Sequence, residues 1–182
     1  MILSWPRLRR TAAIPAEIRV RADLPRGEKV LASDATTDGS WLLGTRRSLL
    51  ILTADDRVVV PWEEVEDVAW DMEGEQLRIT SIGEFGAPRP SYTLATGEEP
   101  HLLLQLIRER VTASIVLQRR VPVAQDQDQR LGLTVIGRRS PSGGPVRWMH
   151  AYDEGLDPTS PEVVAAADLA LVQAQAEVGD VI

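Results

Sequence analysis

The strongest candidate for chemistry in this sequence is a short run, His150-x-x-Asp153-Glu154, which combines an imidazole with two carboxylates. Such groups can hold a metal ion or exchange protons with a substrate. The predicted context is a strand, however, and residues i and i+3 of a strand point to opposite faces. The spacing therefore favours a partly exposed histidine near a strand end. An enzyme with an unrecognised site near His150 stays open as a second alternative.

Other catalytic signatures are absent from the sequence. There is no cysteine, which removes thiolate metal sites, iron–sulfur clusters, cysteine nucleophiles and disulfides. No P-loop, dinucleotide-binding glycine pattern, nucleophile elbow or zinc-protease motif occurs. Ser142-Gly143-Gly144 is not a phosphate loop, because neither a lysine nor a helix follows it. We therefore expect no enzymatic activity, no cofactor and no bound metal.

The charge distribution restricts the partners. Residues 1–26 carry six arginines against two acids, whereas residues 27–113 carry eight bases against sixteen acids. Residues 114–182 carry six bases against nine acids, and the whole chain has a net charge of −7. An acidic body repels phosphate backbones, so we expect no nucleic-acid partner.

No apolar run approaches the ~18 residues of a membrane span, so we expect no integral membrane segment. The absence of cysteine suits the reducing cytoplasm, which is the expected location.

The first two-thirds of the chain shows a series of short strands between turn signals such as Asp38-Gly39. A short helix precedes them after Pro15, and a helix over about 99–113 with Leu102, Leu103 and Leu106 at helical spacing follows them. The seven predicted strands are Lys29–Ala35, Trp41–Gly44, Ser48–Thr53, Arg57–Trp62, Val65–Met72, Gln76–Ile82 and Ser91–Ala95.

The last third predicts three strands and a helix. Residues 114–123 could extend the preceding helix, but their β-branched content favours a strand. A polar loop is expected over Ala124–Arg130, then strands over Leu131–Arg139 and Pro145–Asp153. Ser160-Pro161-Glu162 predicts the start of a helix that ends at Gly179. Val164, Ala167, Leu171 and Ala174 or Gln175 line its expected buried face, and the small residues would allow close approach to a sheet or to another helix.

Three fragments resemble the bacterial pleckstrin-homology-like (PH-like) group. They are Gly27-Glu28-Lys29-Val30-Leu31, residues 43–49 with Thr45-Arg46-Arg47, and residues 59–68 with Pro61-Trp62. Over residues 27–113 the resemblance implies an α+β fold with a seven-stranded antiparallel β-barrel or sandwich and a C-terminal capping helix. The basic segment with a short helix (1–26) and the βββα appendage (114–182) are predicted from the patterns above. The resemblance does not account for the appendage. It implies no activity, because this fold hosts lipid, peptide and protein binding alike.

The hypothesis is a non-catalytic protein-binding or self-assembly module. Its expected interaction surface is Trp41, Arg46, Arg47 and Trp148, because aromatic and arginine side chains dominate many interfaces. Phosphoinositide is disfavoured, since the predicted first hairpin, residues 33–40, has two acids and no base. The alternative is a peripheral membrane adaptor that uses Trp5, Arg7, Arg9 and Arg10.

Overall fold

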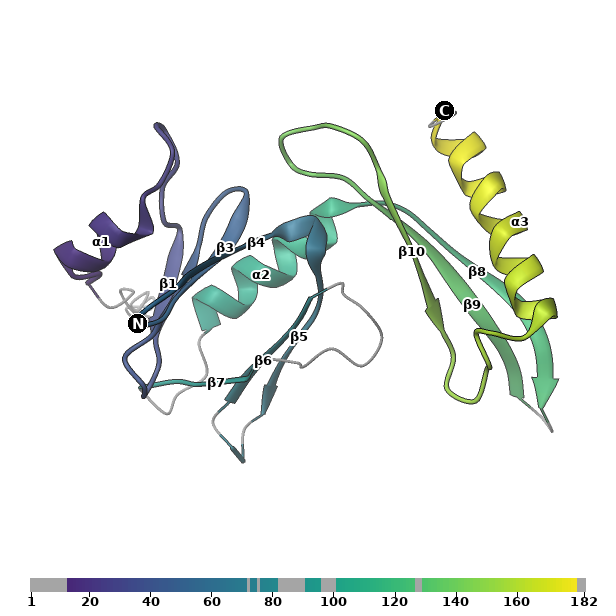
Figure 1. Cartoon of the computed structure of the whole chain (residues 1–182), viewed down its shortest axis with the longest axis horizontal. Helices are drawn as coiled ribbons and strands as arrows, with labels where there is room; N and C mark the ends of the chain where they lie inside the picture. The colour runs from purple at the N-terminus through teal and green to yellow at the C-terminus, as the bar shows by residue number, and fades with distance from the viewer. Residues whose placement is uncertain are drawn as a thin grey trace, which may run out of the picture. The chain divides into compact units, whose positions relative to one another are not determined.

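A computed structural model of the chain describes residues 13–71, 73–74, 76–81, 91–95, 101–126 and 129–179. The chain divides into two compact units, Met1–Arg110 and Val111–Ile182. Both units mix α-helices with antiparallel sheets (Figure 1). The predicted α+β class is therefore confirmed, and each unit is described by itself below.

The first sheet of the N-terminal unit is a four-stranded antiparallel meander. It contains β1 (Ala32–Ala35), β2 (Trp41–Gly44), β3 (Ser48–Leu52) and β4 (Arg57–Pro61) in sequence order. All five residues of the central strand β3 are buried, because both faces of the sheet are covered. On one face Leu43 and Leu50 pack against helix α1 (Ala16–Ala22). On the other, Gly44 lies close to leucines of helix α2 (His101–Ser114).

The second sheet follows after a single turn of 3-10 helix, η1 (Trp62–Glu64). It contains β5 (Val65–Asp71), β6 (Gln76–Ser81) and β7 (Ser91–Thr93) in that order. The end of β1 meets the end of β7 through a bridge between Thr36 and Leu94, and the amide of Ala95 donates to the carbonyl of Ala35 at 2.9 Å. Each of the seven predicted strands thus corresponds to a strand of the structure.

The expectation of a barrel is corrected: the described residues form two separate sheets and no closed barrel. The chain leaves the first ladder at Pro61, which has no amide hydrogen to donate, and then turns through η1 before β5 begins. β4 and β5 are therefore not paired, and the described backbone hydrogen bonds and bridge between the two sheets join residues 35–37 to residues 93–95.

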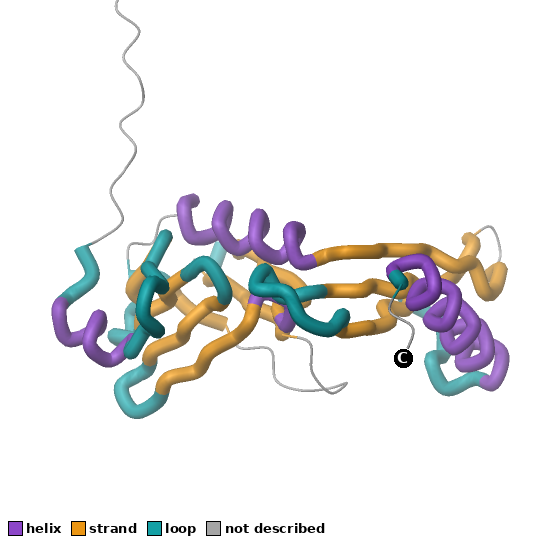
Figure 2. The backbone as a smooth tube through the Cα atoms, turned by 90° about the horizontal axis from the view of Figure 1, so that it is seen from above, coloured by secondary structure: helices purple, strands orange, loops and turns teal. Residues whose placement is uncertain are grey.

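Helix α2 ends where the sequence changes from leucine-rich to β-branched. The Ser114 hydroxyl donates to the carbonyl of Val111 at 2.6 Å, and the strand β8 (Ile115–Asp126) begins at the next residue. Figure 2 shows the chain passing directly from this helix into β8. The preference for a strand after residue 114 is therefore confirmed. Of the predicted apolar stripe, Leu103, Leu106 and Ile107 are buried, whereas Leu102 is exposed.

The C-terminal unit is a three-stranded antiparallel sheet with one helix on it. β9 (Gln129–Arg138) lies between β8 and β10 (Arg147–Tyr152), and α3 (Pro161–Val178) packs on β8 and β9. The βββα order is as predicted. The polar loop expected over Ala124–Arg130 is corrected at both of its ends, because Ala124 pairs with Leu131 and Asp126 pairs with Gln129 in β8 and β9; residues 127 and 128 lie outside the described residues.

Helix α3 carries the predicted capping signals. The side chain of Ser160 accepts a hydrogen bond from the amide of Val163 at 3.4 Å, Pro161 stands in the first turn, and Gly179 has a φ of 73°. The buried residues are Val163, Ala167, Ala170 and Ala174, which pack on Leu133 and Val135 of β9 among others. The predicted buried face is therefore right at Ala167 and Ala174, and Leu171 is partly buried against the same cluster. It is wrong at Val164, which is exposed.

Candidate interaction surfaces

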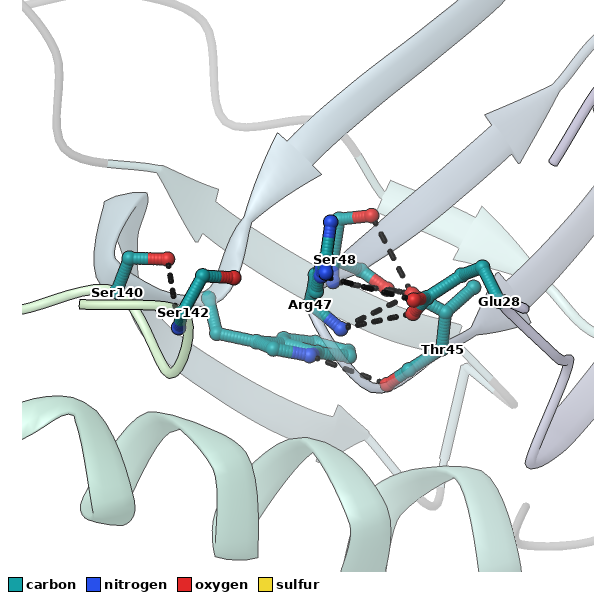
Figure 3. A network of polar contacts seen from close by, with 7 residues as sticks. Glu28, Thr45, Arg47, Ser48, Ser140 and Ser142 are labelled. Carbon is teal, nitrogen blue, oxygen red and sulfur yellow. Dashed lines mark hydrogen bonds and ion pairs between the residues drawn. The ribbon is translucent and has the colours of Figure 1, made fainter. Parts of the chain in front are cut away.

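Arg46 and Arg47 occupy the turn between β2 and β3, and the backbone of this turn is fixed by its neighbours (Figure 3). The hydroxyl oxygen of Thr45 accepts from the amide of Arg47 at 3.2 Å and from that of Ser48 at 3.1 Å. The indole Nε1 of Trp62, which is fully buried, donates to the carbonyl of Thr45 at 3.2 Å. Hydrogen bonds from within the turn and from Trp62 thus hold its backbone in place.

The two arginines differ in how far their charge is compensated. Glu28 accepts from the amide of Arg47 at 3.2 Å, and its other carboxylate oxygen lies 3.7 Å from the guanidinium Nε of Arg47. Arg46 is exposed and has no ion pair with any described residue. The predicted basic pair thus presents one uncompensated cation, which gives only weak attraction to an anionic surface.

The predicted tryptophans both contribute to packing. Trp41 is half-buried against the cluster that joins α1 to the first sheet, where it pairs with Leu52 of β3. Trp148 belongs to the C-terminal unit, is half-buried, and lies so close to Gly137 that a Cβ there would meet the indole ring at 2.8 Å. Trp41 thus belongs to the N-terminal unit with Arg46 and Arg47, and Trp148 belongs to the C-terminal unit.

His150 lies on β10, between Trp148 and Tyr152 on the same face of the strand. Its ring centroid is 6.1 Å from that of Tyr152, and its buried Nε2 atom has no hydrogen-bond partner among the described residues. Asp153 forms an ion pair with Arg120 and accepts from the amide of Gly132 at 2.8 Å. The carboxylate of Asp153 therefore contacts both β8, which carries Arg120, and β9, which carries Gly132. The hydrogen bond from Arg120 lowers the pKa of Asp153.

No metal-binding cluster of three His, Asp or Glu side chains occurs among residues 13–71, 73–74, 76–81, 91–95, 101–126 and 129–179. The basic N-terminal residues Trp5, Arg7, Arg9 and Arg10 lie outside the described residues. Within the described helices, none is long and apolar enough to span a membrane.

The hairpin between β1 and β2 is acidic, as the sequence predicts. Asp38 accepts hydrogen bonds from the hydroxyl of Thr36 and from the amide of Ser40, and these bonds lower its pKa. Asp34 is different, because burial raises the pKa of its carboxyl group. Asp38 therefore keeps its negative charge in this hairpin.

The largest exposed apolar side chains of the C-terminal unit lie on the outer side of α3. Leu169 is 60% exposed and Val172 is 62% exposed, and the exposed Ala165 and Ala176 continue the row toward either end of the helix. We call these four residues the α3 outer face. They lie opposite the buried Ala170 and its neighbours, because the two sets are about half a turn apart. Sequence reasoning placed one apolar face on this helix; the apolar spacing 165, 169, 172, 176 would have revealed a second.

The chain was compared with protein-family models, with curated proteins and with solved structures, and no match was found in any of the three comparisons.

Proposed function

We propose that this protein is a non-catalytic binding and assembly module whose interface is the α3 outer face. The observation that supports the proposal is the apolar character of both sides of α3. A helix with an apolar face on each side is expected to be buried on each side. One side packs on β8 and β9, and the other carries Leu169 and Val172 with more than half of each side chain exposed.

The exposed row has the composition of a protein interface and not of a solvated helix surface. Between Ala165 and Ala176 its members are alanine, leucine and valine, and the charged Asp168 lies beside the row. Full burial of one leucine or valine side chain contributes about 1.5–3 kcal/mol, so a partner that covers Leu169 and Val172 gains a useful fraction of this from each. Single exposed apolar residues need no explanation, but a contiguous row on one helix does.

We further propose that the N-terminal unit is a PH-like scaffold. Three observations support this assignment: the division of the seven strands into sheets of four and three, the bridge between the ends of β1 and β7, and the position of helix α2 after the last strand. In this proposal the unit does not bind phosphoinositides, because Asp38 occupies the hairpin and Arg46 is the cation left uncompensated at the next turn. The proposed interface itself lies on α3, in the C-terminal unit.

Site-specific photocrosslinking tests the proposed interface. A photoreactive phenylalanine analogue is placed at position 169, and a matched control is placed at Val20, which is 78% exposed on α1. We expect a discrete, saturable crosslinked product in an extract of the native cells from position 169 and not from position 20. Val172→Glu in the same chain should abolish that product. Equal, diffuse labelling from both positions contradicts the proposal.

A further inference from the structure

The α3 outer face has the spacing of a coiled-coil seam. Ala165, Leu169, Val172 and Ala176 are separated by four, three and four residues, which is the alternation of the a and d positions of a heptad. This spacing keeps the four side chains in one narrow stripe that a straight helix can follow over three turns. The stripe is therefore shaped for another helix and not for a flat or concave surface.

The order of small and large side chains along the stripe is the same from either end of the helix. Reversing the helix about a point between Ala170 and Leu171 places Leu169 on Val172 and Ala165 on Ala176. Two copies of α3 that run antiparallel would thus pair large with large at the centre and small with small at both ends. The terminal alanines would let the two helices approach closely, since they leave little side chain between the backbones.

We infer that the occupant of the α3 outer face is the same face of a second copy of this chain, packed antiparallel across a two-fold axis near residues 170 and 171. This inference rests on the proposed function and names its partner. A two-fold axis is the commonest symmetry of homo-oligomers, and it requires a patch that complements itself. The reversed order of the stripe meets that requirement.

Charge selects the antiparallel over the parallel arrangement. Helix α3 carries Glu162, Asp168 and Glu177 and has no basic residue. A parallel pair would place each acid beside its own copy, which is unfavourable. The antiparallel pair places Asp168 opposite the uncharged Gln173 and separates the two ends of the helix. Glu177 is in addition compensated within its own chain by an ion pair with Arg119.

The seam is short, with four residues from each helix, so the dimer should be a transient one. Interfaces at the small end of the size range are weak, and we expect a dissociation constant on the order of 10 µM. The protein should then be monomeric at nanomolar concentration and dimeric at a few hundred micromolar.

Single-cysteine variants test the arrangement directly, because the chain has no cysteine of its own. In the antiparallel pair, Ala165→Cys of one copy meets Ala176→Cys of another. The two 165 positions lie 11 residues apart along the pair, roughly 16 Å at 1.5 Å per residue. A disulfide needs Cα atoms within about 4–7 Å. We expect the mixture of the two variants at about 200 µM, on the order of twenty times the expected dissociation constant, to form disulfide-linked dimers at least ten times faster than either variant alone.

The solution mass of the full chain gives an independent measurement. Leu169→Glu should make the protein monomeric at 200 µM with an unchanged circular dichroism spectrum, whereas the control Val20→Glu should remain dimeric. Rapid crosslinking of the Ala165→Cys variant alone would show a parallel pair and overturn the arrangement. If the parent protein is monomeric at 200 µM, the inference that a second copy covers the α3 outer face is overturned. In that case, a discrete photocrosslinked product between position 169 and another protein would still support the proposed function. Diffuse labelling from position 169 would contradict both the proposed function and the dimer.

Discussion

Two substitutions at neighbouring positions, Leu169→Ala and Ala170→Leu, test which face of α3 packs on the sheet. Leu169 is 60% exposed and Ala170 is 2% exposed, although they are adjacent in the sequence. Leu169→Ala removes side-chain atoms from solvent-facing positions, and we expect a change in the free energy of unfolding within about 0.5 kcal/mol. Ala170→Leu adds three carbon atoms between α3 and the sheet. Overpacking of this kind costs about 1–3 kcal/mol.

The alanines of the inner face are the reason for the larger cost. Ala167, Ala170 and Ala174 let the helix pack close to Leu133 and Val135, which are fully buried. A leucine at position 170 forces the helix away from the sheet along its length, because the neighbouring alanines cannot fill the gap that results. A loss of about 2 kcal/mol corresponds to a decrease of roughly 8–16 °C in the melting temperature of a unit of this size.

The assay is urea unfolding at low micromolar concentration, where the proposed dimer is dissociated and does not add to the stability. Hydrogen exchange at Leu133 and Val135 locates the effect in the C-terminal unit. If Ala170→Leu is as stable as Leu169→Ala, the inner face is not tightly packed, and the distinction between the two faces of α3 is refuted.

Three further substitutions have defined outcomes. Asp34→Asn should raise the free energy of unfolding at pH 7, because burial raises the pKa of Asp34 and its ionised form is disfavoured in the folded state. In urea unfolding at a pH below the ordinary pKa of 3.8, the carboxyl group is protonated in both states and this difference between the variant and the parent should disappear. Trp62→Phe keeps most of the buried ring but leaves the carbonyl of Thr45 without its donor, so a thermal melt should show a loss of about 1–3 kcal/mol. Gly132→Ala should cost about 3 kcal/mol in urea unfolding, because its Cβ would lie 2.4 Å from the backbone oxygen of Val121, which cannot move without breaking the ladder; stability equal to that of the parent would contradict the observed register.

Local patterns predicted the strands well because each strand is short and ends at a recognisable turn. Asp38-Gly39, for example, separates β1 from β2, and Gly39 has a φ of 82°, a value that favours glycine. The start of α3 was equally predictable, since the capping role of Ser160 depends on residues within one turn. These elements are determined by their neighbours in sequence.

Features that depend on pairing across the chain were harder to predict. The polar composition of residues 124–130 predicts a loop, and only the pairing of β8 with β9 places residues 124–126 in a strand. The separation of the two sheets depends on where Pro61 stands in the ladder, which no local pattern shows. The orientation of α3 was predicted only in part, because an alanine-rich helix with apolar residues on both sides gives no unique inner face.

Helix α1 has a consequence for how the N-terminal unit can meet other molecules. It lies on the outer face of the first sheet, where Ile18 and Ala22 cover Leu43 and Leu50. The guanidinium of Arg57 secures it by donating to the carbonyl of Ala22 at 3.0 Å. Around Leu43 and Leu50 this face of the sheet is therefore closed to other molecules, and a change in specificity there would have to arise in the turns at the strand ends, where residues can vary without disturbing the leucines beneath.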